Sequence, residues 1–154
     1  MIQRDVLIVD DDWPVREVLH EIFLSAGYTC HLARDGREGL AVFETARPPL
    51  TITDLKMPHM DGIQLLRAVL EADPNAAVII LTGAADVKTA IDSLKLGAYD
   101  FIMKPVNVDQ LLIAADRALE RRQLLIERRE YQAYLELRVE EATHDLQQAF
   151  HQLK

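Results

Sequence analysis

The feature that most constrains the fold is an alternation of short apolar runs with helical patterns. Four runs are continuous and mostly apolar, and they cover residues 6–9, 50–53, 78–81 and 101–103. Continuous rather than alternating apolar residues are typical of strands buried on both faces, as in a parallel sheet covered by helices. A fifth run, at residues 28–33, is more polar and suits the edge of such a sheet.

Helical patterns fill the segments between these runs. The clearest covers residues 15–26, with Pro14 in its first turn and Gly27 as its stop. Weaker patterns of helical spacing cover residues 40–43, 63–70, 87–94 and 108–119. Strand and helix therefore alternate five times at a pitch of roughly 20 to 28 residues, which predicts a doubly wound α/β fold with a parallel sheet.

The last segment, residues 121–154, differs in composition from the rest of the chain. It contains no proline or glycine, and its apolar residues alternate in steps of four and three: Leu135, Val139, Ala142, Leu146, Ala149 and Leu153. This spacing predicts a long helix that continues the fifth one and ends in a dimerising coiled coil. The alternative is a helix that folds back on the domain, which would need a wider apolar face. We therefore divide the chain into a domain at 1–120 and a helical linker at 121–154.

Length, charge and cysteine content narrow the class of protein. The 154 residues suffice for one domain with a core and an extension. A formal net charge of −8 disfavours direct binding to nucleic acid. The single Cys30 cannot form an internal disulfide, which fits a reducing compartment. Because the apolar stretches are also too short for a signal peptide or a membrane span, we expect a cytoplasmic protein without membrane contact.

Polar residues stand where the apolar runs end. Asp10 and Asp11 follow the first run, Asp54 follows the third, Thr82 the fourth and Lys104 the fifth. In an open α/β sheet, ligands bind at the carboxyl ends of the strands. The sequence thus predicts that three carboxylates, a hydroxyl and an ammonium group face one crevice.

This set of groups has a chemical logic. Three carboxylates suit a hard cation such as Mg²⁺, which prefers oxygen ligands. A lysine, a threonine hydroxyl and backbone N–H groups suit the oxygens of a phosphoryl group. Together they indicate phosphoryl transfer, with the central Asp54 as the nucleophile that forms an acyl phosphate. For the neighbouring Asp12 we expect a role at the start of the helix rather than in the metal site.

Four short motifs carry a resemblance to a known family. "VDDD", "TDLKMPHMDG", "LTG" and "KP" occur in this order within residues 4–120. Together they resemble the receiver domain of two-component response regulators. The resemblance implies a flavodoxin-like five-stranded parallel sheet with strand order 2-1-3-4-5. It also implies a phosphoacceptor signalling domain rather than an enzyme, with Mg²⁺-dependent self-phosphorylation and autodephosphorylation only.

The resemblance assigns the chemical roles at the site. Asp54 would accept a phosphoryl group from a phosphohistidine on a sensor histidine kinase or phosphotransfer protein. The Mg²⁺ ligands would be the carboxylates of Asp10, Asp11 and Asp54 and the backbone carbonyl of Lys56.

Two further positions would respond to phosphorylation. Thr82 would bind a phosphoryl oxygen after the switch, and Phe101 would rotate inward with it. Lys104 would pair with the phosphoryl group, and its bond to Pro105 is expected to be cis, as an X–Pro bond allows.

Two alternatives for the function follow from the same residues. A phosphohydrolase of haloacid-dehalogenase type also uses an aspartyl nucleophile after a strand, but it has a second aspartate two residues later, where this chain has Lys56. A degenerate receiver that only binds partners would lack one of the acids or Lys104, and this chain has them all.

The output and the lifetime of the signal are separate questions. The segment 121–154 resembles linkers that precede HD-GYP cyclic-di-nucleotide phosphodiesterases or other signalling modules, and it predicts a homodimer. Ala84, two residues after Thr82, cannot orient a water molecule. We therefore expect slow hydrolysis of phosphorylated Asp54.

Overall fold

The computed structural model describes residues 2–153, and the contacts within it divide the chain into two units. The first unit is Met1–Arg122 and the second is Gln123–Lys154. Residue 1 of the predicted domain (1–120) and residue 154 of the predicted linker (121–154) lie outside the described residues.

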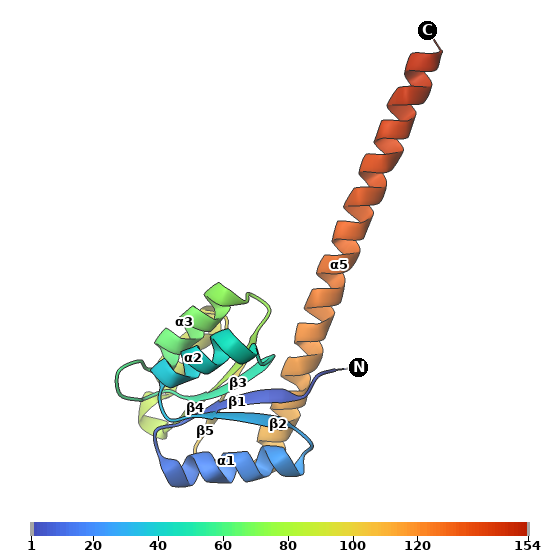
Figure 1. Cartoon of the computed structure of the whole chain (residues 1–154). Coiled ribbons are helices and arrows are strands. Elements are labelled where there is room, and N and C mark those ends of the chain that lie inside the picture. Colours follow the sequence, from blue (N-terminus) through green and yellow to red (C-terminus); the bar gives the residue numbers. More distant parts are fainter. Residues whose placement is uncertain (1, 154) are drawn as a thin grey trace. The chain divides into compact units, whose positions relative to one another are not determined.

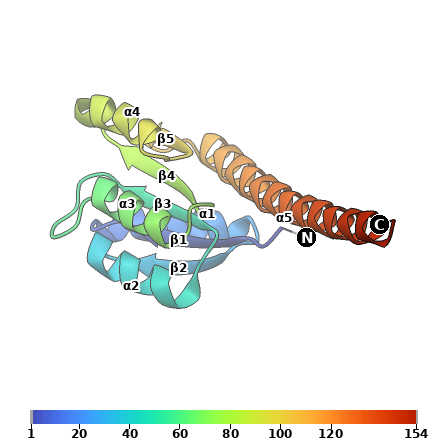
Figure 2. The same ribbon diagram turned by 90° about the horizontal axis from the view of Figure 1, so that it is seen from above.

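The first unit is built from five strands that alternate with helices. The strands are β1 (Asp5–Val9), β2 (Thr29–Ala33), β3 (Leu50–Asp54), β4 (Ala77–Thr82) and β5 (Asp100–Met103). The helices are α1 (Trp13–Ser25), α2 (Gly36–Ala46), α3 (Gly62–Ala72), the short η1 (Ala84–Asp86), α4 (Val87–Lys95) and α5 (Val108–Gln152). The sheet is parallel with the order β2-β1-β3-β4-β5, as Figures 1 and 2 show. The flavodoxin-like fold and the edge position of the polar run are confirmed.

Both faces of the sheet are covered, which explains the continuous apolar runs. Val6 and Ile8 of β1 belong to a core cluster with residues of α1 and α5, while Leu7 and Val9 belong to a second cluster with residues of α2 and α3. All four side chains are fully buried. Figure 1 shows α1 on one side of the strands and α2 and α3 on the other. Successive residues of a strand point to opposite faces, so a strand covered on both sides is apolar at most positions.

The residues that flank α1 differ in how they end the helix. Gly27 follows the helix with a backbone φ of 87°, a left-handed conformation that glycine adopts without strain. Asp12 occupies the position before the first helical residue, as expected, but its side chain makes no capping hydrogen bond. Its backbone N–H instead donates to Oδ1 of Asp10 at 2.9 Å. The expected capping role of the Asp12 carboxylate is therefore wrong.

Helix α5 belongs to both units. Its first part packs on the sheet through Leu111, Ala114, Ala115, Ala118 and Leu119, which are buried. The second unit is helical as far as Gln152, and every described residue from 127 onward is exposed. The predicted continuation of the fifth helix is confirmed. Among residues 2–153, no helix combines the length and the apolar character needed to cross a membrane.

Candidate functional site

The carboxyl ends of the strands hold the predicted site residues through the backbone. The N–H of Asp10, directly after β1, donates to the carbonyl of Ala33 at 3.1 Å. Across the sheet, the N–H of Lys104 donates to the carbonyl of Thr82 at 2.8 Å. These bonds extend the pairing of the strands by one residue. The backbones that carry the polar side chains are thereby as fixed as the sheet itself.

Three carboxylates meet at this edge of the sheet. One oxygen from each of Asp10, Asp11 and Asp54 lies within 4.8 Å of the others. Asp10 is fully buried, the Asp54 side chain is 14% exposed, and Asp11 is exposed. Three like charges at such distances repel one another. Because all three groups offer oxygen atoms, the cluster fits a hard divalent cation such as Mg²⁺.

Lys104 supplies one positive charge to the cluster. Its Nζ lies 3.3 Å from Oδ2 of Asp10 and 3.2 Å from Oδ1 of Asp54. One ammonium group among three carboxylates leaves the cluster with an excess of negative charge. The predicted convergence of Asp10, Asp11, Asp54 and Lys104 is thus present in the fold.

The surroundings shift the proton affinity of both central groups. Burial and the nearby Asp10 carboxylate raise the pKa of Asp54 above its ordinary value, although Lys104 opposes them. Burial alone would lower the pKa of Lys104, but the charges of Asp10 and Asp54 outweigh it and raise this pKa. The lysine therefore stays charged at neutral pH, whereas Asp54 carries its charge at a cost in free energy.

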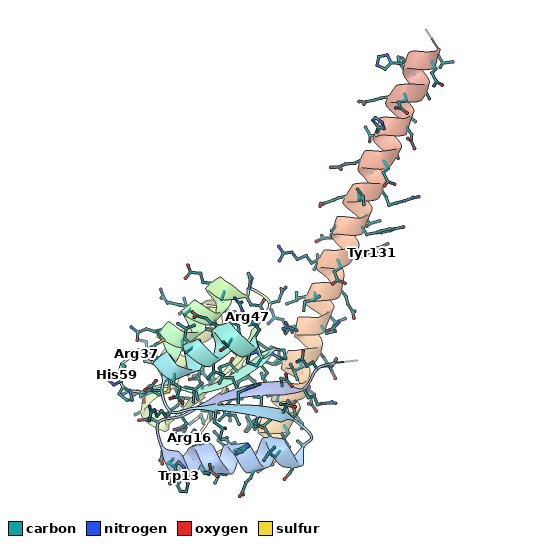
Figure 3. The ribbon with its side chains drawn as sticks, in the orientation of Figure 1. Trp13, Arg16, Arg37, Arg47, His59 and Tyr131 are labelled. Carbon is teal, nitrogen blue, oxygen red and sulfur yellow. The ribbon has the colours of Figure 1, made fainter. Side chains whose placement is uncertain are left out.

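Arg16 is a residue of this region that sequence reasoning missed. Its Nη1 donates to the backbone carbonyl of Asp10 at 2.6 Å. Figure 3 shows Arg16 near the start of α1, where Trp13 is also found, and Trp13 is exposed. Because the bond is made to a main-chain atom, no sequence motif could have pointed to it. Arg16 holds the turn that carries Asp10 and Asp11 against the first turn of α1.

Thr82 and Phe101 make no hydrogen bond to the carboxylates of Asp10, Asp11 or Asp54 in the described structure. Thr82 is buried at the end of β4, and its hydroxyl donates to the carbonyl of Gly83 at 3.1 Å. Phe101, on β5, is partly buried against the cluster that includes α2 and α3. The bond between Lys104 and Pro105 is cis, as expected.

The loop after β3 is joined to the segment after β4 by an ion pair. Nζ of Lys56 lies 3.0 Å from Oδ1 of Asp86, and the Lys56 side chain is 76% exposed. No local sequence signal points to this contact, because thirty positions separate the two residues. The contact concerns the Lys56 side chain, so the role of its carbonyl as a metal ligand stays a prediction.

The start of α3 closes tightly on the central aspartate. Asp61 and Gln64 form a reciprocal capping box, and the N–H of Gly62 donates to the carbonyl of Leu55 at 2.8 Å. A Cβ atom at Gly62 would clash with the carbonyl oxygen of Asp54. Only glycine allows this approach, which explains the "DG" of the motif as the start of a helix.

Comparison with known proteins places these features in a family. The family model described as the response regulator receiver domain matches residues 6–116. Regulatory protein AtoC of Escherichia coli is 37% identical over 115 residues, which cover 75% of this chain and 25% of AtoC. Nitrogen assimilation regulatory protein NtrX of Azorhizobium caulinodans is 38% identical over 129 residues, which cover 82% of this chain and 28% of NtrX.

A solved structure agrees with these sequence matches. A response regulator receiver domain protein from Clostridium thermocellum has a TM-score of 0.75 and 35% identity, over 79% of this chain and 98% of that one. The chain spans about a quarter of the length of the curated relatives, which are named as regulatory proteins.

Proposed function

Because this chain belongs to the receiver domains of two-component response regulators, we propose that Asp54 is the residue that accepts the phosphoryl group. The observation that carries the proposal is the meeting of Asp54 with the Lys104 ammonium and two further carboxylates at one sheet edge. The Asp54 side chain is partly accessible, and it ends β3, the middle strand of the sheet. A phosphoryl donor can reach it from outside.

The transfer of the phosphoryl group is a simple displacement at phosphorus. A carboxylate oxygen of Asp54 forms a bond to phosphorus while the bond between phosphorus and the imidazole nitrogen of a partner phosphohistidine breaks. The electron pair of the broken bond stays on that nitrogen. Lys104 stabilises the negative charge on the phosphoryl oxygens, and the protein contributes mainly positioning and charge neutralisation.

The divalent cation would be Mg²⁺, held by Asp10, Asp11, Asp54 and the carbonyl of Lys56. When bound, it would neutralise negative charge on the carboxylates and on the phosphoryl oxygens. The nearby Trp13 offers a direct test, because its fluorescence is expected to respond to millimolar Mg²⁺. An Asp11→Asn variant should respond only at higher concentrations, and an unchanged titration in that variant would contradict the ligand assignment.

Phosphorylation itself can be tested with acetyl phosphate. Incubation with Mg²⁺ is expected to add one phosphoryl group, detected by intact-protein mass spectrometry. Asp54→Asn should abolish the addition, while Asp92→Asn, an exposed position on α4, should leave it unchanged. Full labelling of the Asp54→Asn protein would show that another residue is the acceptor.

The signal would pass from Asp54 to Thr82 and Phe101. The Thr82 hydroxyl, which now donates to Gly83, would turn to a phosphoryl oxygen, and Phe101 would move inward in the space that this frees. Such a change shifts a pre-existing equilibrium rather than creating a new state. Thr82→Ala is expected to be phosphorylated normally while the chemical shifts of β4 and α4 change less than in the wild type.

The lifetime of the phosphorylated state would be long. Ala84 lies in η1 and has no group that could orient a water molecule, and the nearby Lys56 ammonium is paired with Asp86. We expect Ala84→Glu to shorten the lifetime of the acyl phosphate, as measured by loss of the added mass over time. A wild-type lifetime of seconds that this substitution does not alter would contradict the idea.

The proposed partners are a histidine kinase or phosphotransfer protein and a second copy of the chain. The second copy would bind the exposed seam of the second unit, which includes Val139 and Leu146. Light scattering should give the mass of a dimer for the wild type and of a monomer for a variant with Val139→Lys and Leu146→Lys. His144→Lys, on the opposite side of the helix, is the matched control and should remain dimeric.

The output of the signal belongs to the proposal as well. An HD-GYP phosphodiesterase or another signalling module, attached or recruited through the helix, would read the phosphorylation state in the cytoplasm. The chain itself would catalyse only its own phosphorylation and dephosphorylation. Its excess of acidic residues supports a role without direct contact with nucleic acid.

A further inference from the structure

Asp11 is the exposed member of the acidic cluster, and no partner fixes the direction of its carboxylate. In the part of the chain that the structure describes, no hydrogen bond or ion pair involves this carboxylate. Asp10 and Asp54, in contrast, both lie against Lys104. One oxygen of Asp11 is nevertheless within 4.8 Å of an oxygen of each of the other two aspartates. The backbone conformation of Asp11 therefore decides whether its carboxylate reaches the cluster.

The peptide groups on either side of Asp11 are both held by hydrogen bonds. The carbonyl oxygen of Asp10, in the peptide group before Asp11, accepts from Nη1 of Arg16 at 2.6 Å. The N–H of Asp12, in the peptide group after Asp11, donates to Oδ1 of Asp10 at 2.9 Å. Because each peptide group is planar, these two bonds restrict the two dihedral angles between the planes. Those angles are φ and ψ of Asp11.

Arg16 connects this turn to a helix that the core holds in place. Its backbone N–H donates to the carbonyl of Asp12 at 3.0 Å, within the first turn of α1. The same helix is anchored by Leu19 and Phe23, whose side chains are buried in the core. The side chain of Arg16 thus transmits the position of α1 to the carbonyl that precedes Asp11.

Of the two bonds that restrict Asp11, only the bond from Arg16 comes from outside the acidic cluster. The other bond is accepted by the carboxylate of Asp10, which also faces Lys104 and is a proposed ligand of Mg²⁺. The ion would therefore compete for that carboxylate. Arg16 binds a main-chain carbonyl that is not among the proposed ligands, so its bond is compatible with the ion.

We infer that Arg16 is a positioning residue for the proposed Mg²⁺ site, because it orients Asp11 through the Asp10 carbonyl. The inference rests on the proposed function and adds a residue that touches neither the ion nor the phosphoryl group. The charge of Arg16 alone would repel a divalent cation. A ligand that is already oriented, however, loses less conformational freedom when the ion binds. The two effects have opposite signs, so the variant shows directly which one dominates.

Binding of Mg²⁺ to the full chain can be followed by NMR, from the amide resonances of β3 and β4 during a titration with MgCl₂. Arg16→Met is expected to weaken the affinity by about tenfold, the effect of losing a contact that orients a metal ligand. Arg16→Lys keeps the charge on a shorter side chain without the planar guanidinium, and it should also weaken the affinity. Arg67→Met removes an exposed arginine of α3 and is the matched control, with unchanged affinity.

A double variant tests whether Arg16 acts through Asp11. In a chain that already carries Asp11→Ala, Arg16→Met should change the affinity by less than about twofold, because the ligand that Arg16 orients is gone. At saturating Mg²⁺, Arg16→Met alone should be labelled by acetyl phosphate at nearly the wild-type rate, because the bound ion then holds Asp11.

The outcomes separate the inference from the proposed function. An affinity of Arg16→Met equal to or higher than that of the wild type would overturn the inference, even if urea unfolding showed a loss of stability. An equal loss of affinity with and without Asp11 would overturn the route through Asp11, and slow labelling at saturating Mg²⁺ would do the same. An unchanged affinity in Asp11→Ala would instead contradict the proposed ligands of the metal ion.

Discussion

The substitution Asp54→Asn is expected to stabilise the protein at neutral pH in the absence of a metal ion. Asparagine has nearly the same shape, and its amide oxygen can still accept the N–H of Leu55, which lies 2.9 Å from Oδ1 in the wild type. The substitution removes a negative charge that is partly buried and close to two other carboxylates. Residues that carry out a function often reduce the stability of the fold in this way.

The size of the stability change can be estimated from the distances between Asp54 and the neighbouring charges. At an effective dielectric constant of about 20, two unit charges 4.8 Å apart, the upper limit for Asp10 and Asp54, repel by about 3.5 kcal/mol. The exposed Asp11 adds about 1 kcal/mol, because water screens it. Lys104 at 3.2 Å offsets these terms with an attraction of about 5 kcal/mol. The charge terms nearly cancel, so the cost of burying the carboxylate decides the sign.

The raised pKa of Asp54 agrees with a gain in stability when its charge is removed. We expect the free energy of unfolding to increase by about 1 to 2 kcal/mol in the variant. An acid whose pKa is raised on folding binds more protons in the folded state, so the wild type loses stability as pH rises from the ordinary value through the raised value. The difference should vanish below the ordinary aspartate pKa and reach its full size near neutral pH.

Urea unfolding followed by circular dichroism, with EDTA and at several pH values, measures this difference. Asp92→Asn removes one exposed charge on α4 and should change stability little at any pH. An Asp54→Asn protein less stable than the wild type at neutral pH would refute the reasoning, as would a difference that does not depend on pH.

Three further substitutions test the contacts around the site. Lys104→Met leaves the fully buried Asp10 without its cation, and we expect a loss of about 2 to 4 kcal/mol in urea unfolding without metal; Lys88→Met on α4 should have little effect. Tyr28→Phe removes the hydroxyl that donates to Asp116 at 2.6 Å and should cost about 1 kcal/mol, whereas Tyr134→Phe, which is exposed, should cost nothing measurable. Asp86→Asn breaks the ion pair with Lys56, and because that lysine is mostly exposed, stability should change by less than about 1 kcal/mol. A loss of several kcal/mol in this last variant would show that the pair does more than its exposure suggests.

The sequence was sufficient for the parts of the fold that depend on local pattern. Strands covered on both faces are apolar at most positions, so β1 and β4, and β3 with its two buried threonines, were readable as continuous runs. The meeting of the polar residues that follow these strands was predictable as well, because parallel strands share one carboxyl edge. The order of the strands in the sheet came from the resemblance to the receiver family, because no local pattern places β1 next to β3.

Contacts between distant residues could not be predicted in the same way. The bond from Arg16 to the Asp10 carbonyl and the pair of Lys56 with Asp86 depend on loop geometry, which neither spacing nor composition determines. At Asp12, even a contact between near neighbours in the sequence was not predicted. Aspartate before a helix usually caps it, but here the backbone of Asp12 is turned toward the Asp10 side chain.

The close approach of Gly62 to Asp54 limits where the backbone around Asp54 can move. The main chain after Asp54 is held on one side by the N–H of Leu55, which donates to the Leu81 carbonyl at 3.0 Å. On the other side the start of α3 touches the Asp54 carbonyl, with no room for even a methyl group. Gly83, by contrast, is exposed and has open space around it. If a group is added to Asp54, we therefore expect the backbone at the start of α3 to stay in place and the displacement to occur around Gly83.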